Sequence, residues 1–223
     1  MADDTAEPRS GEQQSGGAHV VARGAPRISR ESPSRTSLTR PSTTRLSPTA
    51  IAKALGASRR AVDTRWPVIE KALWTEGITD RRSQIAAVAT VVAEVGKDLR
   101  PVNEYGSRAY FRRMYEGRTD LGNTRPGDGA RYHGRGYIQL TGRANYRAYG
   151  RKLDLPLEDR PGLALRPYVG ARVLAEYFKE RRIAHDARRG RWRHVRLKVN
   201  GGYNGWPTFH RAVTSLRHVS RSR

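Results

Sequence analysis

The chain has 223 residues, contains no cysteine and carries a formal net charge of +22 at pH 7. This length accommodates one ordinary domain with some spare chain. The lack of cysteine excludes a disulfide framework, thiolate chemistry and a cysteine-ligated zinc site. No apolar run is long enough to span a membrane, and the opening MADDTAEPRS has neither the basic nor the apolar region of a signal peptide. We therefore expect a protein without a membrane span that is made in the cytoplasm.

Residues 1–46 differ in composition from the remainder of the chain. They are rich in Ser, Thr, Pro, Gly and Arg and contain no aromatic residue. Such a segment cannot bury enough apolar surface to fold, so we predict a disordered polar tail at 1–46 and one folded domain at 47–223. The tail has seven arginines and five acidic residues, a net charge of +2, which leaves +20 on the domain. A domain this basic attracts polyanions such as nucleic acids, anionic lipids or bacterial walls.

The first part of the domain has a helical pattern. Apolar residues recur at helical spacing from Pro48 until Gly56 interrupts them, and a second short helix is predicted from Pro67 to Gly77. Residues 48–80 therefore have the outline of a helix-turn-helix, which makes DNA binding an alternative function. Because such patterns are common in helical proteins, we favour nucleic acid less as a partner.

The segment SQIAAVATVVAEV, residues 83–95, predicts a helix that is apolar on all sides and therefore buried. Glu94 is its only carboxylate, and it lies about half a turn away from the stripe that begins at Ile85. Desolvation and the negative end of the helix dipole would both raise the pKa of a carboxyl group in this last turn. A general acid at neutral pH needs such a raised pKa. The alternative is a helix-end residue that reaches water past Gly96.

Glycines, aromatic residues and amides are concentrated between residues 123 and 150, in NTRPGDGARYHGRGYIQLTGRANYRAYG. Residues 137–141 alternate in polarity, which predicts a strand-like segment with one face on the core and the other toward a ligand. A short helix that Gly150 would stop follows this segment. The side chains predicted to face a ligand are Tyr137, Gln139 and Thr141.

The string GRGYIQLTGRANY at 134–146, the preceding DLGNTRPGDGARYHGRG from Asp120, and VNGGYNG at 199–205 together resemble the glycoside hydrolase family 19 catalytic domain. This family includes chitinases and phage-type endolysins. The resemblance implies a mainly α-helical, lysozyme-like domain with two lobes and a central cleft. It also implies hydrolysis, with inversion, of β-1,4 links in polymers of N-acetylglucosamine, by a monomer that needs no cofactor.

Two carboxyl groups must face one cleft for glycoside hydrolysis, one as acid and one as base. In the family the acid lies at the end of a central helix, which corresponds to Glu94 here, although the usual HETGG-like context is reduced to AEVGKD. The base is Glu104 or Glu116, ten or twenty-two residues further on. We favour Glu104, since bacterial members have the closer spacing. For Glu116 the alternative is a salt bridge with a neighbouring arginine: Arg112, Arg113 or Arg118.

The resemblance also implies roles for other polar side chains. Thr141 would help to hold the attacking water, while Gln139, Asn145 and Asn200 would bind the N-acetyl sugar. Tyr137 would offer a flat face to a pyranose ring. The alternatives are turn and cap roles for the amides and the hydroxyl, and buried packing for the tyrosine. His133 lacks the HExxH spacing of a metal ligand, so we expect no metal site.

The polymer itself stays open at this point, because chitin and peptidoglycan share the sugar unit and the linkage. The basic domain and the absence of a signal peptide favour an anionic bacterial wall that the enzyme would reach after its release. A wall-binding module that has lost catalysis is a further alternative. Neither candidate carboxylate is clearly missing, which favours an enzyme.

Overall fold

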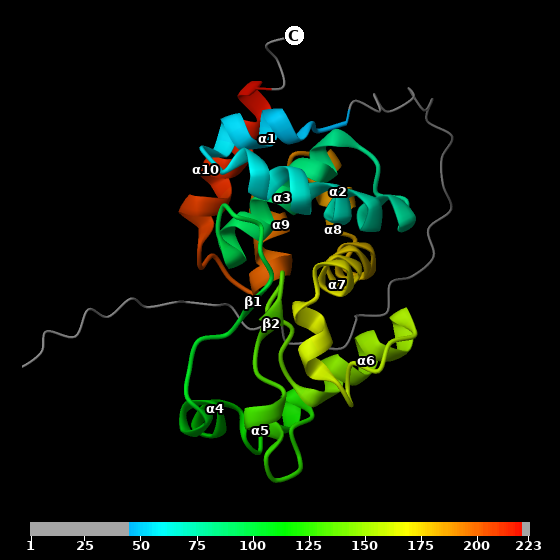
Figure 1. Cartoon of the computed structure of the whole chain (residues 1–223), viewed down its shortest axis with the longest axis vertical. Coiled ribbons are helices and arrows are strands. Elements are labelled where there is room, and N and C mark those ends of the chain that lie inside the picture. Colours follow the sequence, from blue (N-terminus) through cyan, green and yellow to red (C-terminus); the bar gives the residue numbers. More distant parts are fainter. Residues whose placement is uncertain (1–44, 220–223) are drawn as a thin grey trace, which may run out of the picture.

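The computed structural model describes residues 45–219, which form two helical lobes with a short antiparallel pair of strands between them (Figure 1). The predicted mainly α-helical class is confirmed. The upper lobe in Figure 1 contains α1 (Pro48–Leu55), α2 (Arg59–Thr75), α3 (Arg81–Val95), α8 (Ile183–Arg188), α9 (Trp192–Asn200) and α10 (Trp206–Val219). The lower lobe contains α4 (Arg108–Tyr115), η1 (Thr119–Leu121), α5 (Asp128–Arg131) and α6 (Arg143–Leu153).

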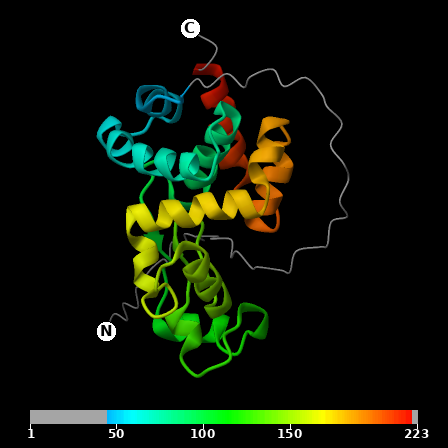
Figure 2. The ribbon, with the colours of Figure 1, turned by 90° about the vertical axis from the view of Figure 1, so that its right-hand side faces the viewer.

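The remaining elements lie where the lobes meet. Strands β1 (Val102–Asn103) and β2 (Arg135–Gly136) pair antiparallel, with Val102 opposite Gly136. The short helix η2 (Pro161–Leu165) leads into α7 (Pro167–Glu180), which runs across the boundary between the lobes in Figure 2. Within residues 45–219, no helix combines the length and the apolarity needed to cross a membrane.

Helix α3 forms the centre of the core. Every residue from 83 to 92 is buried, which confirms the prediction of a helix apolar on all sides. Asp80 caps its N-terminus by accepting a hydrogen bond from the Ser83 backbone N–H at 2.9 Å. Gly96 ends it with φ 88°, as predicted. The packing of α8, α9 and α10 around α3 fixes the direction in which its last turn points.

The chain enters the domain one residue earlier than predicted. Leu46, assigned from composition to the tail, is 1% exposed and belongs to the core. Its backbone N–H donates to Gln84 Oε1 at 2.8 Å, and its carbonyl accepts from Trp66 Nε1 at 2.8 Å. The polar tail itself lies almost entirely outside the described residues, so its prediction stays untested.

The predicted start of the second helix at Pro67 is wrong, since α2 begins at Arg59. Gly56 does form the expected turn, with φ 56°, but α2 then continues through Pro67 to Thr75. Proline removes one backbone donor and usually bends or ends a helix. Here Trp66 and Ile69 are buried where α2 packs against α7, and this packing outweighs the local preference.

The predicted strand-like alternation at 137–141 is also wrong. Residues 137–139 form a turn closed by hydrogen bonds between Arg135 and Leu140, and all five side chains are buried. The following helix, α6, passes Gly150 and ends at Asp154, which has φ 52°. Gly150 is needed for packing instead, since a Cβ there would lie 2.8 Å from the Leu155 carbonyl oxygen.

Candidate active site

Glu94 lies in the last turn of α3, and its side chain is only 3% exposed. The carboxylate accepts a hydrogen bond at 2.5 Å from Nη1 of Arg196, a residue of α9 that is itself buried. Arg196 is held in turn by the Asn204 carbonyl, to which its Nε donates at 2.7 Å. A segment between α9 and α10 therefore positions the partner of the candidate acid.

The surroundings of Glu94 favour its protonated form. Burial raises the pKa of this carboxyl group, while the positive charge of Arg196 and its hydrogen bond oppose that rise. The carbonyl groups at the end of α3 act in the same direction as burial. A carboxyl group that keeps its proton at higher pH has the property required of a general acid.

Glu104 directly follows β1 and is held by neutral donors. Its Oε1 accepts from the Tyr115 hydroxyl at 2.7 Å and its Oε2 from the Gly134 backbone N–H at 2.8 Å. The Glu104 N–H donates back to the Gly134 carbonyl at 2.8 Å, which continues the β1–β2 pairing by one residue. The pairing of β1 with β2 thus fixes the position of this carboxylate relative to Gly134.

Three oxygen atoms from predicted site residues surround Gly134. A Cβ placed on this glycine would lie 2.9 Å from Gln139 Oε1, 3.0 Å from Glu104 Oε2 and 3.3 Å from Thr141 Oγ1. Real Cβ atoms rarely tolerate contacts this short, so only glycine fits here without displacing its neighbours. The structure therefore brings Glu104, Gln139 and Thr141 together, as the sequence motif suggested.

The turn after β2 orients two of these groups. Gln139, which has φ 51°, donates from Nε2 to the carbonyls of Val102 and Gly136, both at 3.1 Å. With the amide nitrogen used in this way, Oε1 is the atom turned toward Gly134. Thr141 is fully buried and its hydroxyl donates to the Gln139 carbonyl at 2.9 Å, so the oxygen lone pairs remain as acceptors.

The remaining predicted residues differ in their surroundings. Asn145 Nδ2 donates to the Thr141 carbonyl at 2.6 Å, which ties α6 to the turn. Asn200 is 8% exposed, and both its amide nitrogen and its amide oxygen are buried without a hydrogen-bond partner. Tyr137 is fully buried, an environment that favours packing over stacking on a sugar. Its hydroxyl has no partner, and burial raises its pKa to about 12.

Glu116 performs a different task from Glu104. Its two carboxylate oxygens accept from the Gly127 and Gly129 backbone N–H groups at 2.5 and 2.7 Å. These backbone hydrogen bonds hold the pKa of Glu116 below its usual range. Among the described residues, Glu116 forms no ion pair with Arg112, Arg113 or Arg118, and Arg118 pairs with Asp120 at 2.6 Å instead. Glu116 thus ties the end of α4 to the start of α5.

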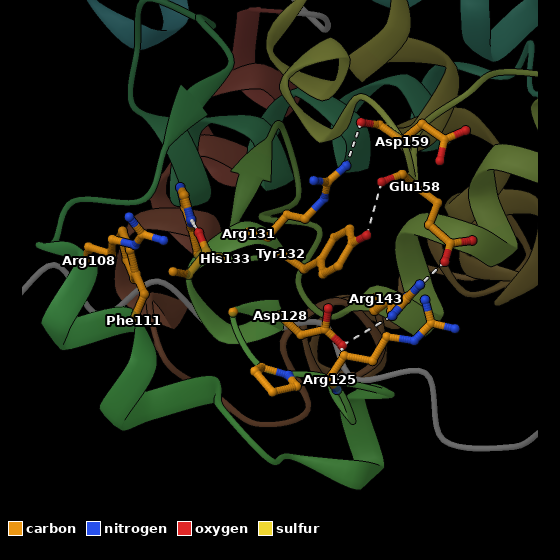
Figure 3. A pocket seen from close by; sticks show the side chains of 13 residues that line it. Arg108, Phe111, Arg125, Asp128, Arg131, Tyr132, His133, Arg143, Glu158 and Asp159 are labelled. Atoms are coloured by element: carbon orange, nitrogen blue, oxygen red, sulfur yellow. Dashed lines mark hydrogen bonds and ion pairs between the residues drawn. The ribbon is translucent and has the colours of Figure 1, made fainter.

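Figure 3 shows a pocket of about 640 Å³ in the lower lobe, and none of the predicted site residues lines it. Two of its three acidic side chains are paired, as Arg143 contacts Glu158 at 2.8 Å and Asp128 at 3.5 Å. Hydrogen bonds from Arg147 and Arg143 lower the pKa of Glu158 to about 2. A carboxyl group held ionised in this way is unsuited to general acid catalysis.

Sequence reasoning missed three residues beside the two carboxylates. Arg196 lies four residues before Asn200, one turn away on the same face of α9, and this spacing beside the VNGG motif could have indicated it. Tyr115 and Tyr105 had no such signal. Tyr105 follows Glu104 directly and is 89% exposed, an unusual position for a large aromatic side chain.

The contacts of His133 indicate a structural role. Its ring stacks on Phe111 with 4.0 Å between the ring centres, and Nε2 lies 3.0 Å from Asn103 Oδ1. Among residues 45–219, no group of three or more His, Asp or Glu side chains is placed to hold a metal ion.

Comparisons with curated proteins and with solved structures indicate what this chain is similar to. The chain is 34% identical over 95 residues to a glycosyl hydrolase family 19 domain-containing protein from Haemophilus influenzae, a match covering 42% of the chain and 44% of that relative. The chain thus spans less than half of the curated relative's length. No family model matches the chain.

Solved structures of bacterial chitinases have the same fold. Chitinase C from Streptomyces griseus HUT6037 superposes with a TM-score of 0.58 at 18% identity, covering 82% of each chain. A chitinase C mutant gives 0.60 at 17% identity over 78% of this chain and 76% of its own. A bacterial family 19 chitinase gives 0.56 at 16% identity over 77% of this chain and 94% of its own.

In sequence over 95 residues and in fold, this chain is similar to glycosyl hydrolase family 19 proteins. The lysozyme-like fold expected from the motifs is thereby confirmed. In this domain, Glu104 and the motif residues Gln139 and Thr141 meet at Gly134, while Glu94 lies at the end of the central helix.

Proposed function

We propose that this domain hydrolyses β-1,4-linked polymers of N-acetylglucosamine by single displacement with inversion. The observation that carries the proposal is the group of three oxygen atoms around Gly134, contributed by Glu104, Gln139 and Thr141. Oxygen acceptors arranged in this way suit a water molecule that must give up one proton and keep its other hydrogen bonded. Inversion rests on the resemblance to family 19.

In the proposed mechanism Glu94 protonates the leaving glycosidic oxygen. Burial raises its pKa, which supports this role, and the hydrogen bond from Arg196 keeps its carboxyl group in one orientation. As the proton leaves, Arg196 stabilises the carboxylate that forms. Burial and Arg196 thus act in opposite directions on Glu94: burial helps it to keep its proton, and the cation lowers the cost of giving that proton up.

Glu104 acts as the base that accepts a proton from the attacking water. Its Oε2 and the oxygens of Gln139 and Thr141 are all turned to the same point, so the water can donate to two acceptors and direct its lone pair toward the sugar. The Gly134 N–H and the Tyr115 hydroxyl hold the carboxylate in place. Glu104 is preferred over Glu116 because its Oε2 lies at Gly134 together with the oxygens of Gln139 and Thr141, whereas Glu116 binds the backbone N–H groups of Gly127 and Gly129.

Asn200 supports an N-acetyl sugar as the ligand. A buried primary amide whose two polar atoms lack partners is unfavourable by about 1–3 kcal/mol per group unless a ligand satisfies it. The acetamido group of N-acetylglucosamine offers one N–H and one carbonyl. It would complement the Oδ1 and Nδ2 atoms of Asn200.

The test is hydrolysis of chitin hexamer and of purified peptidoglycan, with proton NMR of the fresh product. We expect the α-anomer to appear first, since the base delivers water to the face opposite the leaving group. Glu94→Gln keeps the shape of the side chain but cannot donate a proton, and it should lower turnover at least about 100-fold. Normal activity in Glu94→Gln, or a β-anomer as the first product, would overturn the proposed mechanism.

A further inference from the structure

A groove of about 520 Å³ lies beside β1, between α2 and the start of α7. Three arginines line it: Arg65 of α2, Arg100 before β1 and Arg166 before α7. No acidic residue is among the described residues that line the groove. It therefore combines a concave shape with three positive charges.

The charges of these arginines are not neutralised within residues 45–219. Arg65 donates from Nη1 to the Asp98 backbone carbonyl at 2.9 Å, which satisfies one donor without balancing the charge. Arg100 and Arg166 are exposed, and their guanidinium groups have no carboxylate partner in the described structure. By contrast, Arg143 and Arg147 in the lower lobe are both paired with Glu158.

Apart from the arginines and Asn103, the lining of the groove is apolar, and Val102 and Asn103 directly precede Glu104 in the chain. Pro101, Val102, Leu165 and Pro167 contribute to this lining. Val102 links the groove to the candidate active site, because its carbonyl accepts from Gln139 Nε2 and it lies two residues before Glu104. Figure 1 shows this strand at the junction of the two lobes, so a polymer bound at Glu104 would have the groove within reach.

We propose that this groove, which we call the arginine groove, binds carboxylate groups attached to the polysaccharide. The proposal rests on the proposed function and narrows its substrate. Planar guanidinium groups pair with carboxylates through two parallel hydrogen bonds. Chitin has no anionic group, whereas the strands of peptidoglycan carry lactyl-linked peptides with free carboxylates. The arginine groove therefore favours peptidoglycan-type strands as substrate.

The experiment compares binding of two polymers with the same backbone, neutral glycol chitin and anionic carboxymethyl chitin. Binding is measured with Glu94→Gln, so that hydrolysis does not interfere. Adding Arg100→Gln and Arg166→Gln should weaken binding of carboxymethyl chitin about tenfold relative to glycol chitin, as two solvent-exposed ion pairs are lost. The matched control is Arg211→Gln with Arg217→Gln on α10, which removes the same charge from exposed positions outside the groove.

Three results would overturn the proposal. The control pair could weaken carboxymethyl chitin as much as the groove pair, which would show a general charge effect. Both polymers could weaken equally, which would show that the groove does not recognise charge. On peptidoglycan, the groove substitutions could weaken binding only while teichoic acid is still attached, which would make phosphate the ligand. Failure of the proposed function is recognised separately, by an unmutated protein that binds these polymers and hydrolyses none of them.

Discussion

The surroundings of Glu94 and those of Glu104 show how one fold gives two identical carboxyl groups different chemistry. Glu94 is enclosed between α3 and α9, where burial raises its pKa and a single buried cation contacts it. Glu104 lies at the end of a two-residue strand and is held by a hydroxyl and a backbone amide, both neutral. The comparison shows that helix packing controls the proton affinity of Glu94, while the pairing of β1 with β2 controls the position of Glu104.

The largest loss of activity should come from replacing Glu104, the proposed base. Glu104→Gln should lower hydrolysis of chitin hexamer by about 10²–10⁴-fold, because the amide cannot accept the proton of the attacking water. Glu116→Gln is the matched control, and it should act mainly on the loop that Glu116 ties down. An inactive Glu116→Gln beside an active Glu104→Gln would exchange their assigned roles.

Crowding the space around Gly134 should have the next largest effect. Gly134→Ala would press on three oxygen atoms, and displacing them should reduce turnover by about 10–100-fold with a smaller change in the melting temperature. Gly162→Ala is the control, since a Cβ there meets nothing within 4 Å and its backbone is not left-handed. Equal activity of the two variants would show that the position of these oxygens does not matter for catalysis.

The smallest expected effect is a shift in pH dependence. An acid works while it is protonated, so activity is lost as pH rises through the pKa of Glu94. Arg196 lowers that pKa, and Arg196→Gln should therefore move the alkaline limb of the rate profile to higher pH. Arg196→Lys keeps the charge and should leave the limb nearly in place. A shift of the Arg196→Gln limb toward lower pH would contradict the assignment of Glu94 as acid.

Much of the fold could be predicted because it follows local rules. An apolar segment ending at Gly96 predicts a buried helix whatever surrounds it, and α3 is such a helix. The Pro67 prediction failed since the packing of α2 on α7 is a tertiary effect that no local pattern encodes. Residues 137–141 alternate in polarity, which predicts a strand. All five are nevertheless buried, and residues 137–139 form a turn.

The individual residues of the candidate site could be predicted from the sequence, but the contacts between them could not. The motif indicated Gln139 and Thr141, and spacing favoured Glu104, yet only the structure shows that their oxygens meet at Gly134. Spacing alone left Glu104 and Glu116 as competitors, because a sequence does not show which backbone N–H groups a carboxylate will find. Arg196 is separated from Glu94 by about a hundred residues, so its pairing depends entirely on how α9 docks.

The two hydrogen bonds at Leu46 determine how far the chain can be trimmed from its N-terminus. Cleavage directly after Arg45 leaves the contacts of Leu46 with Gln84 and Trp66 in place. A cut beyond Leu46 strips a buried leucine from α2 and α3, a loss on the order of 2–5 kcal/mol by analogy with core truncations. Limited proteolysis of the folded protein should therefore converge on a fragment that retains this leucine.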